Sequence, residues 1–198
     1  SKFYQSHKNS KIKLMQAAFQ LLVLSDNSNE KTHYTYYGRK KLKVLLSEIN
    51  NSIKRWYRKK YIDQNFLQEI IDDKPFIFLP LQQEPERSLL LSAPDYKNQI
   101  ETVEYVSKCL PENFLLFVKE HPTQGSGRDW REISQYKALQ NNPKVRLIHP
   151  SVPADEIIKK SKLVISVSGT IALESAFLNT PSITIADNDY TLIPSISR

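Results

Sequence analysis

The stretch LVISVSGTIALESAF, residues 163–177, decides the fold because its pattern changes in the middle. It begins with an apolar, β-branched run that is typical of a buried strand. From residue 170 onward its apolar side chains recur at helical spacing. The polar turn between the two patterns contains Gly169, which lets the backbone approach a ligand or adopt a positive φ. The stretch therefore predicts a strand, a tight turn and a helix in direct succession.

The same alternation extends outward over residues 74–198. Apolar runs that indicate buried strands occupy residues 76–81, 114–118, 145–148, 163–166 and 182–185. Helical patterns occupy residues 95–110, 128–140, 154–161 and 170–178. Strands that are apolar on both faces and alternate with helices favour a doubly wound parallel sheet. We therefore predict a Rossmann-like α/β domain over residues 74–198, truncated at its C-terminus.

Residues 1–73 differ in composition, and we expect a helical, basic linker region that ends a preceding domain. Between Arg39 and Lys60 there are nine Lys or Arg residues and one Glu, whereas the whole chain carries only +7. The apolar residues of this segment recur at helical spacing, which predicts an amphipathic helix. Three interpretations remain open: a linker helix packed on the domain, a helix on an anionic membrane surface, or a helix that binds an acidic partner. We expect no nucleic acid partner.

Composition excludes several classes of protein. The chain has 198 residues, of which 40% are apolar and only four are Gly, so it is neither collagenous nor generally disordered. No apolar stretch reaches the roughly 20 residues of a membrane-spanning helix. The single cysteine, Cys109, excludes an internal disulfide, and we expect it in the core. We expect a cytoplasmic protein that can lie at the inner face of the membrane.

In a sheet of this kind, ligands bind at the carboxyl ends of the strands. Ser168, Gly169 and Thr170 follow the strand at residues 163–166 and predict a phosphate site, because the first N–H groups of a helix are good anion donors. Glu174 lies about one turn further and can accept hydrogen bonds from ribose hydroxyls. The alternative is an ordinary capped turn with a surface Glu.

Two further turns carry candidate side chains. His121 follows the strand at residues 114–118 and can donate to a phosphate or act as an acid or base. Arg128 and Arg131 come shortly afterwards and can pair with a phosphate. A second His-Pro, at His149, is the weaker candidate because no basic residues accompany it.

The turn after residues 76–81 contains Glu84 and Glu86 on either side of a proline. These carboxylates can position a sugar, act as acid or base, or simply be solvated. The chain has no dinucleotide-binding glycine motif, no P-loop, no CxxC, no HExxH and no GxSxG. No spacing indicates metal ligands, so we expect neither a metal nor a cofactor.

Taken together, the three turns resemble the capsule polysaccharide biosynthesis proteins, which are glycosyltransferase-B-like enzymes related to bacterial Kdo transferases that use a CMP-activated sugar. The resemblance covers roughly residues 76–194 and is carried by Pro80–Ser88, Val118–Pro122 and Ser168–Pro181. It implies a donor-binding, C-terminal half of a two-domain enzyme. The acceptor half, which often supplies the catalytic base, would precede it, so we expect this chain to be inactive alone.

The resemblance also implies roles for individual residues. The implied activity is transfer of a sugar from a nucleotide-activated donor, with a CMP-sugar favoured, to a surface or capsular polysaccharide or a glycolipid. The family's Gln-Pro-Glu reads Glu-Pro-Glu here, its Glu-Ala reads Glu-Ser-Ala, and its Gly-Lys-Pro reads Asn-Thr-Pro, which leaves the donor's identity open. The implied roles are catalysis for Glu86 and His121, nucleotide or phosphate binding for His121, Arg128, Ser168, Gly169, Thr170 and Glu174, and sugar binding for Glu84, Glu86 and Ser88.

Two other functions remain open. UDP-N-acetylglucosamine 2-epimerases share this architecture and also place a Ser-Gly turn six residues ahead of a ribose-binding Glu. Alternatively, a degenerate domain can act without enzymatic activity and bind a partner through residues 39–60. An epimerase needs no acceptor, and a degenerate domain has no nucleotide affinity, so both alternatives are testable.

Overall fold

The computed structural model describes residues 15, 16, 19, 41–70, 74–84, 93–127, 129–186 and 189–197. The chain divides into two compact units, residues 2–57 and 58–198. Glu86, Ser88 and Arg128 lie outside the described residues, so the roles predicted for them stay predictions. The predicted domain boundary between residues 73 and 74 also stays a prediction.

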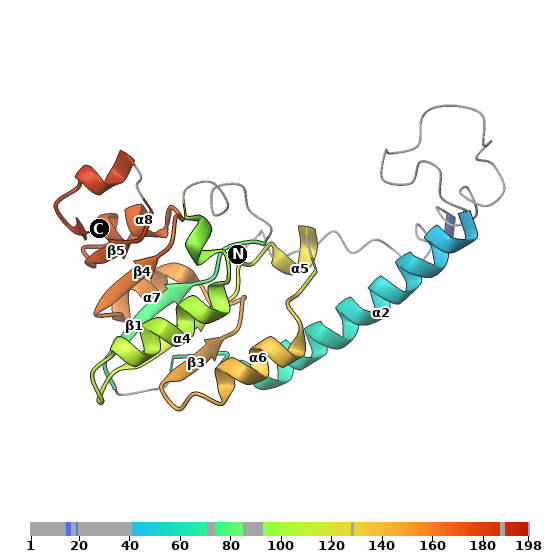
Figure 1. Ribbon diagram of the computed structural model, residues 1–198, viewed down its shortest axis with the longest axis horizontal. Helices are drawn as coiled ribbons and strands as arrows, with labels where there is room; N and C mark the ends of the chain where they lie inside the picture. Colours follow the sequence, from blue (N-terminus) through green and yellow to red (C-terminus); the bar gives the residue numbers. More distant parts are fainter. Residues whose placement is uncertain are drawn as a thin grey trace. The chain divides into compact units, whose positions relative to one another are not determined.

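The second unit is built on a parallel sheet with the strand order β3-β2-β1-β4-β5-β6 (Figure 1). The chain passes from β1 outward to β3 and then returns to the other side of β1, which confirms the predicted doubly wound sheet. The last strand was not predicted, because two residues are too few to form a pattern. The strands are β1 Phe76–Pro80, β2 Leu115–Lys119, β3 Val145–Ile148, β4 Leu163–Ser166, β5 Ser182–Thr184 and β6 Ile196–Ser197.

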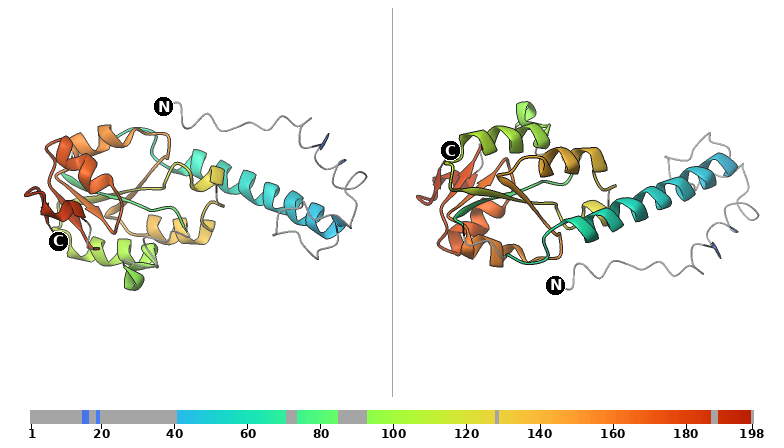
Figure 2. Two further views of the ribbon diagram at one scale, coloured as in Figure 1. Left: turned by 90° about the horizontal axis from the view of Figure 1, so that it is seen from above. Right: turned by 90° about the horizontal axis from the view of Figure 1, so that it is seen from below.

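Helices cover both faces of the sheet, with α4 and α6 on one face and α7 and α8 on the other (Figure 2). Two helices begin later than predicted because a capping residue fixes each start. The Asn98 side chain accepts from the Glu101 N–H at the start of α4, and Glu132 forms a capping box with Gln135 at the start of α6. The helical elements of the unit, besides the end of α2, are η4 Pro94–Tyr96, α4 Gln99–Cys109, α5 Gln124–Gly127, α6 Ile133–Gln140, α7 Ala154–Lys160, α8 Ile171–Phe177 and η5 Asp189–Leu192.

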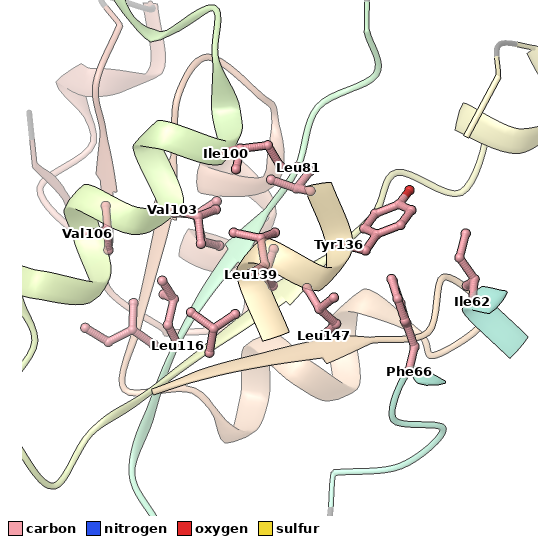
Figure 3. Close-up of a cluster of buried hydrophobic side chains, with 14 of the residues drawn as sticks. Ile62, Phe66, Leu81, Ile100, Val103, Val106, Leu116, Tyr136, Leu139 and Leu147 are labelled. Carbon is pink, nitrogen blue, oxygen red and sulfur yellow. The ribbon is translucent and has the colours of Figure 1, made fainter. Parts of the chain in front are cut away.

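Two apolar clusters hold these layers together. The first lies between the sheet, α4, α6 and the end of α2 (Figure 3). There the rings of Phe66 and Tyr136 meet edge to face, with their centroids 5.1 Å apart. The second lies on the opposite face, where the rings of Phe76 and Phe117 stack with their centroids 4.1 Å apart. Along β2, side chains alternate between the clusters. Because Phe117 belongs to the second cluster, Lys119 lies on that same face.

The predicted amphipathic helix is present as α2, Lys41–Asn65, and is longer than expected. Val44 and Ile62 are buried, but six apolar side chains of the helix are exposed, from 49% at Ile49 to 64% at Trp56. Among the described residues, these six side chains belong to none of the apolar clusters. In the described part of the chain, no helix combines the length and apolar character needed to cross a membrane. The exposed members of this face are Leu42, Leu46, Ile49, Ile53, Trp56 and Tyr57.

The prediction that Cys109 lies in the core is wrong, because this cysteine is exposed at the end of α4. It follows Tyr105 by four residues, and Tyr105 is itself exposed. Residues four apart share a helix face. The buried face of α4 is formed instead by residues such as Val103 and Val106.

One departure from the family pattern has a local explanation. Asn179, where the family has Gly, adopts a φ of 57°, the left-handed region that favours glycine. Asn tolerates this region better than most other residues do. The turn between α8 and β5 therefore uses a backbone conformation that Asn179 can adopt at low cost.

Candidate functional site

A pocket of about 490 Å³ opens at the carboxyl ends of β1, β2 and β4. It lies where the strand order reverses, which is the position expected of a ligand site in a doubly wound sheet. The pocket brings together five predicted site residues: His121, Ser168, Gly169, Thr170 and Glu174. The other lining residues are Phe78, Pro80, Leu81, Gln82, Lys119, Glu120, Pro122, Ala154, Ser166 and Ile171.

The turn after β4 is held by two side chains. The Gly169 N–H donates to Ser166 Oγ at 2.9 Å. With its amide oriented to satisfy both ends, Gln82 accepts from Gly169 N at 2.6 Å and Ser168 N at 2.8 Å. A Cβ at position 169 would lie 3.2 Å from both of these side chains, so glycine permits their close approach.

This arrangement refines the predicted phosphate site. The Ser168 and Gly169 amides already have a protein acceptor in Gln82, so a phosphate oxygen must compete with that carbonyl to bind them. The prediction that these amides bind phosphate remains a prediction. Sequence reasoning missed Gln82, because a glutamine in a polar turn carries no distinctive pattern.

Thr170 and Glu174 lie together on the first turn of α8. Thr170 is the N-cap residue but forms no side-chain capping bond. Its hydroxyl donates instead to Glu174 Oε1 at 3.3 Å. Glu174 is exposed and lines the pocket, so its carboxylate is accessible to a hydroxyl-bearing ligand.

The geometry of the turn after β2 sets the tautomer of His121. The Thr123 backbone N–H donates to His121 Nδ1 at 3.2 Å, and the Thr123 hydroxyl oxygen lies 2.8 Å from the same nitrogen. A backbone N–H can only donate, so the neutral imidazole carries its proton on Nε2. His121 can therefore present a donor from Nε2 to a ligand in the pocket that it lines.

The expectation that Arg131 pairs with a phosphate is wrong. Its side chain is only 3% exposed and forms ion pairs with Glu120 at 3.0 Å and with Glu84 at 2.5 Å. Burial acts to lower the pKa of Arg131, but the two carboxylates outweigh it and the pKa is raised. A buried guanidinium needs such partners, and exchanging them for a ligand would cost stability.

Glu84 is part of this network and not of the pocket wall. Besides Arg131, its carboxylate accepts from Gln99 Nε2 at 2.6 Å. Its partner Glu120 also accepts from the Tyr136 hydroxyl at 2.8 Å. Burial raises the pKa of Glu120, and Arg131 opposes the rise. That Glu84 binds a sugar remains a prediction, and its carboxylate already has two protein partners.

Lys119 is a second pocket residue that sequence reasoning missed. It ends β2, lines the pocket and is 5% exposed. Burial lowers its pKa to about 8, and the carboxylates of Glu174 and Asp155 oppose the change. The available signal was a charged residue at the last position of an otherwise apolar strand.

His149, the weaker candidate, does not line the pocket. Its Nε2 lies 3.1 Å from Asp63 Oδ1 at the end of α2, and its Nδ1 lies 2.6 Å from Ser151 Oγ. Within the described residues, no group of three or more His, Cys, Asp or Glu side chains could hold a metal ion.

The sequence model of the family "Capsule polysaccharide biosynthesis protein" matches residues 4–192. A comparison with curated protein sequences finds no match.

Among solved structures, the chain is similar to a KpsC of Thermosulfurimonas dismutans, a β-Kdo 2,7 transferase. The TM-score is 0.51 at 16% identity, over 98% of this chain and 53% of the other. The chain thus spans about half the length of that protein. A KpsC β-Kdo 2,4 transferase of the same organism matches at a TM-score of 0.45 and 14% identity, over 68% of this chain and 44% of the other. A UDP-GlcNAc 2-epimerase of Methanocaldococcus jannaschii matches at a TM-score of 0.45 and 16% identity, over 71% of this chain and 37% of the other.

Proposed function

Because the chain belongs to the capsule polysaccharide biosynthesis protein family, we propose that it is the donor-binding half of a glycosyltransferase. The donor is a nucleotide-activated sugar, with a CMP-sugar favoured by the resemblance in sequence. The acceptor is a growing surface or capsular polysaccharide or a glycolipid. The observation that carries the proposal is the pocket at the strand-order reversal, which gathers His121, the turn at residues 168–170 and Glu174.

The pocket offers complementary groups for the two polar parts of a nucleotide. His121 Nε2 is a donor that suits a phosphate oxygen. The hydroxyls of Ser168 and Thr170 lie against Gln82 and Glu174, so each can donate to a phosphate by exchanging that partner. Glu174 is an acceptor that suits the vicinal hydroxyls of a ribose. Arg131 takes no part, since Glu84 and Glu120 bind it.

In the proposed reaction, an acceptor hydroxyl attacks the anomeric carbon of the donor sugar. The bond between that carbon and the phosphate oxygen breaks, and the nucleotide leaves with the electron pair. The acceptor's proton passes to a base, which the acceptor half of the protein supplies. His121 and the hydroxyl donors of the turn stabilise the charge that grows on the departing phosphate, and no step requires a metal.

Calorimetric titration tests this proposal. The chain is titrated with CMP, UDP, GDP and their sugar adducts, beside Glu174→Ala and His121→Ala. We expect one nucleotide to bind, and each substitution to weaken it at least tenfold. His149→Ala is the matched control, because it removes the same type of side chain outside the pocket, and it should bind as the unsubstituted chain does.

Two results would contradict the proposal. Absence of binding in a folded chain, repeated in the full-length protein, would remove the donor-binding role and favour an interaction module. Turnover of UDP-N-acetylglucosamine without any acceptor would show an epimerase instead.

The exposed face of α2 supports a second part of the proposal, contact with an anionic membrane surface. Leu46, Ile53 and Trp56 are exposed on a helix that also carries most of the excess positive charge. Basic amphipathic helices bind such surfaces by burying apolar side chains and attracting acidic headgroups. Vesicles with anionic lipid should retain the chain at low salt, while neutral vesicles should not. The anionic vesicles should not retain the Leu46→Ser/Ile53→Ser variant. Equal retention of the variant would contradict the role of this face.

A further inference from the structure

Lys119 is the last residue of β2 and the only charged one in that strand. It lies on the sheet face of Phe117, and its register partner in β3 is Ile148, which is fully buried. Its side chain is only 5% exposed and lines the pocket. The fold therefore places an ammonium at the end of an apolar row, beside the pocket.

Within the described part of the chain, no hydrogen bond or ion pair holds this ammonium. No fully buried side-chain nitrogen there lacks a partner, so Lys119 Nζ is not sealed in the core but reaches the pocket. Arg131, the other buried cation at this end of the sheet, has carboxylates at 2.5 and 3.0 Å. Lys119 has only the more distant influence of Glu174 and Asp155. A largely buried charge without a close partner opposes folding, because bulk water solvates it better than the pocket does. An anion in the pocket would offset that penalty.

The surroundings agree with this interpretation. Burial lowers the pKa of Lys119 to about 8, so most of the population is charged at neutral pH and an approaching anion would hold the proton more firmly. The titratable groups near it are Glu174 of α8, Asp155 of α7, His121, and Glu120, which pairs with Arg131. The Ser168 and Thr170 hydroxyls also line the pocket, in contact with Gln82 and Glu174, and can donate to a phosphate by exchanging these partners.

We infer that Lys119 binds the phosphate of the donor nucleotide, while Glu174 on the opposing helix binds the ribose. This inference rests on the proposed function and adds to it a cation for the phosphate. Arg131 cannot fill this role, because Glu84 and Glu120 bind it. It also makes nucleotide affinity dependent on pH, because the same group must be protonated to bind.

Comparing nucleotides with nucleosides isolates the phosphate contact. The chain is titrated with CMP and cytidine, and with UMP and uridine, beside Lys119→Met and Lys119→Arg. Lys119→Met should bind the nucleotide at least tenfold more weakly and the nucleoside within twofold of the unsubstituted chain. Lys119→Arg keeps the charge and should retain most of the nucleotide affinity. Thermal unfolding of each variant checks that it is folded.

The pH profile provides a second measurement. With a group of pKa about 8 that must be protonated, nucleotide affinity should fall about tenfold between pH 7 and pH 9. The ionisation of the nucleotide phosphate changes by only about a tenth over this range, since its second pKa is about 6. Lys119→Arg should abolish the decline, because an arginine stays charged at these pH values.

The outcomes separate this inference from the proposed function. If Lys119→Met binds the nucleotide as tightly as the unsubstituted chain, the phosphate contact is wrong while the donor site stands. If it weakens nucleotide and nucleoside equally, Lys119 only positions Glu174, and the inference is also wrong. If the unsubstituted, folded chain binds no nucleotide and no nucleoside, the proposed function fails and the inference fails with it.

Discussion

Two turns of this molecule share the sequence His-Pro followed by Thr or Ser, and only one of them lines the pocket. In the turn after β2, His121 Nδ1 accepts the backbone N–H of Thr123 at 3.2 Å. In the turn after β3, His149 Nδ1 accepts the backbone N–H of Ser151 at the same distance. The local structure is therefore the same, and the two strands are neighbours in the sheet.

The difference arises from an offset of one residue. Lys119 of β2 pairs with Ile148 of β3, and His149 follows Ile148 directly. Glu120 stands between Lys119 and His121. Because side chains alternate along extended backbone, this extra residue directs the two imidazoles to opposite faces of the sheet.

The partners agree with that account. Glu120 and His149 share the face of the first apolar cluster, where Glu120 meets Tyr136 and Arg131, and His149 meets Asp63 of α2. His121, in contrast, lines the pocket. A motif thus predicts the local turn, whereas its register decides whether the turn serves a ligand site or the packing of a helix.

The largest expected effect concerns the support of the β2 turn. Arg131→Met leaves Glu120 buried without its cation, and loss of one partner of a buried ion pair costs about 3–5 kcal/mol in the free energy of unfolding. Urea denaturation measures this change. Lys137→Met, on the exposed side of α6, is the control and should change stability by less than about 0.5 kcal/mol. A small effect of Arg131→Met would show that the β2 turn does not depend on this pair.

Lys119→Met should have the opposite sign and stabilise the fold. The pKa of Lys119 is lowered from 10.5 to about 8 in the folded chain, so the unfolded chain binds more protons between these values. The free energy of unfolding should therefore rise from pH 8 to pH 10.5 in the unsubstituted chain, and stay level over this range in the variant apart from other groups. At pH 7 the variant should be more stable by up to about 3 kcal/mol. A less stable variant would mean that Lys119 has a stabilising partner.

Exchanging the two histidines for alanine should separate the roles of the two turns. His149→Ala loses the contact with the half-exposed Asp63 and should cost about 1 kcal/mol in unfolding free energy, without effect on nucleotide affinity. His121→Ala should show the reverse pattern, with weaker nucleotide binding and little change in stability. Thermal unfolding and calorimetric titration of both variants measure these effects. Equal losses in both measurements would remove the distinction between the turns.

The smallest expected effect is that of Asp63→Asn. Burial acts to raise the pKa of Asp63, but hydrogen bonds from Lys59 and His149 outweigh it and lower the pKa. Its contribution to stability is present above the ordinary value of 3.8 and is lost as the pH falls through and below that value. We expect a loss of about a few tenths of a kcal/mol at pH 7, which disappears in denaturation curves at pH values well below 3.8. A loss that persists at low pH would indicate packing instead of charge.

Much of the fold could be predicted from the sequence, because buried parallel strands and their helices have strong local patterns. Val145–Ile148 and Leu163–Ser166 have the bounds predicted for them. The same holds for the pocket position, since strand ends meet at the point where the strand order reverses. His121 and the turn at residues 168–170 followed from that rule together with the residue types that bind phosphate.

The sequence by itself therefore determined the layers, the parallel sheet and the turns that line the pocket, because these depend on short-range periodicity. Only the tertiary structure decided which charges serve those turns. Arg131 turns inward because Glu84 and Glu120 meet it from distant parts of the chain. Lys119 lines the pocket because the register of β2 places it there, and no described carboxylate pairs with it closely. Pairing over such sequence distances depends on strand order and register, which no local pattern contains.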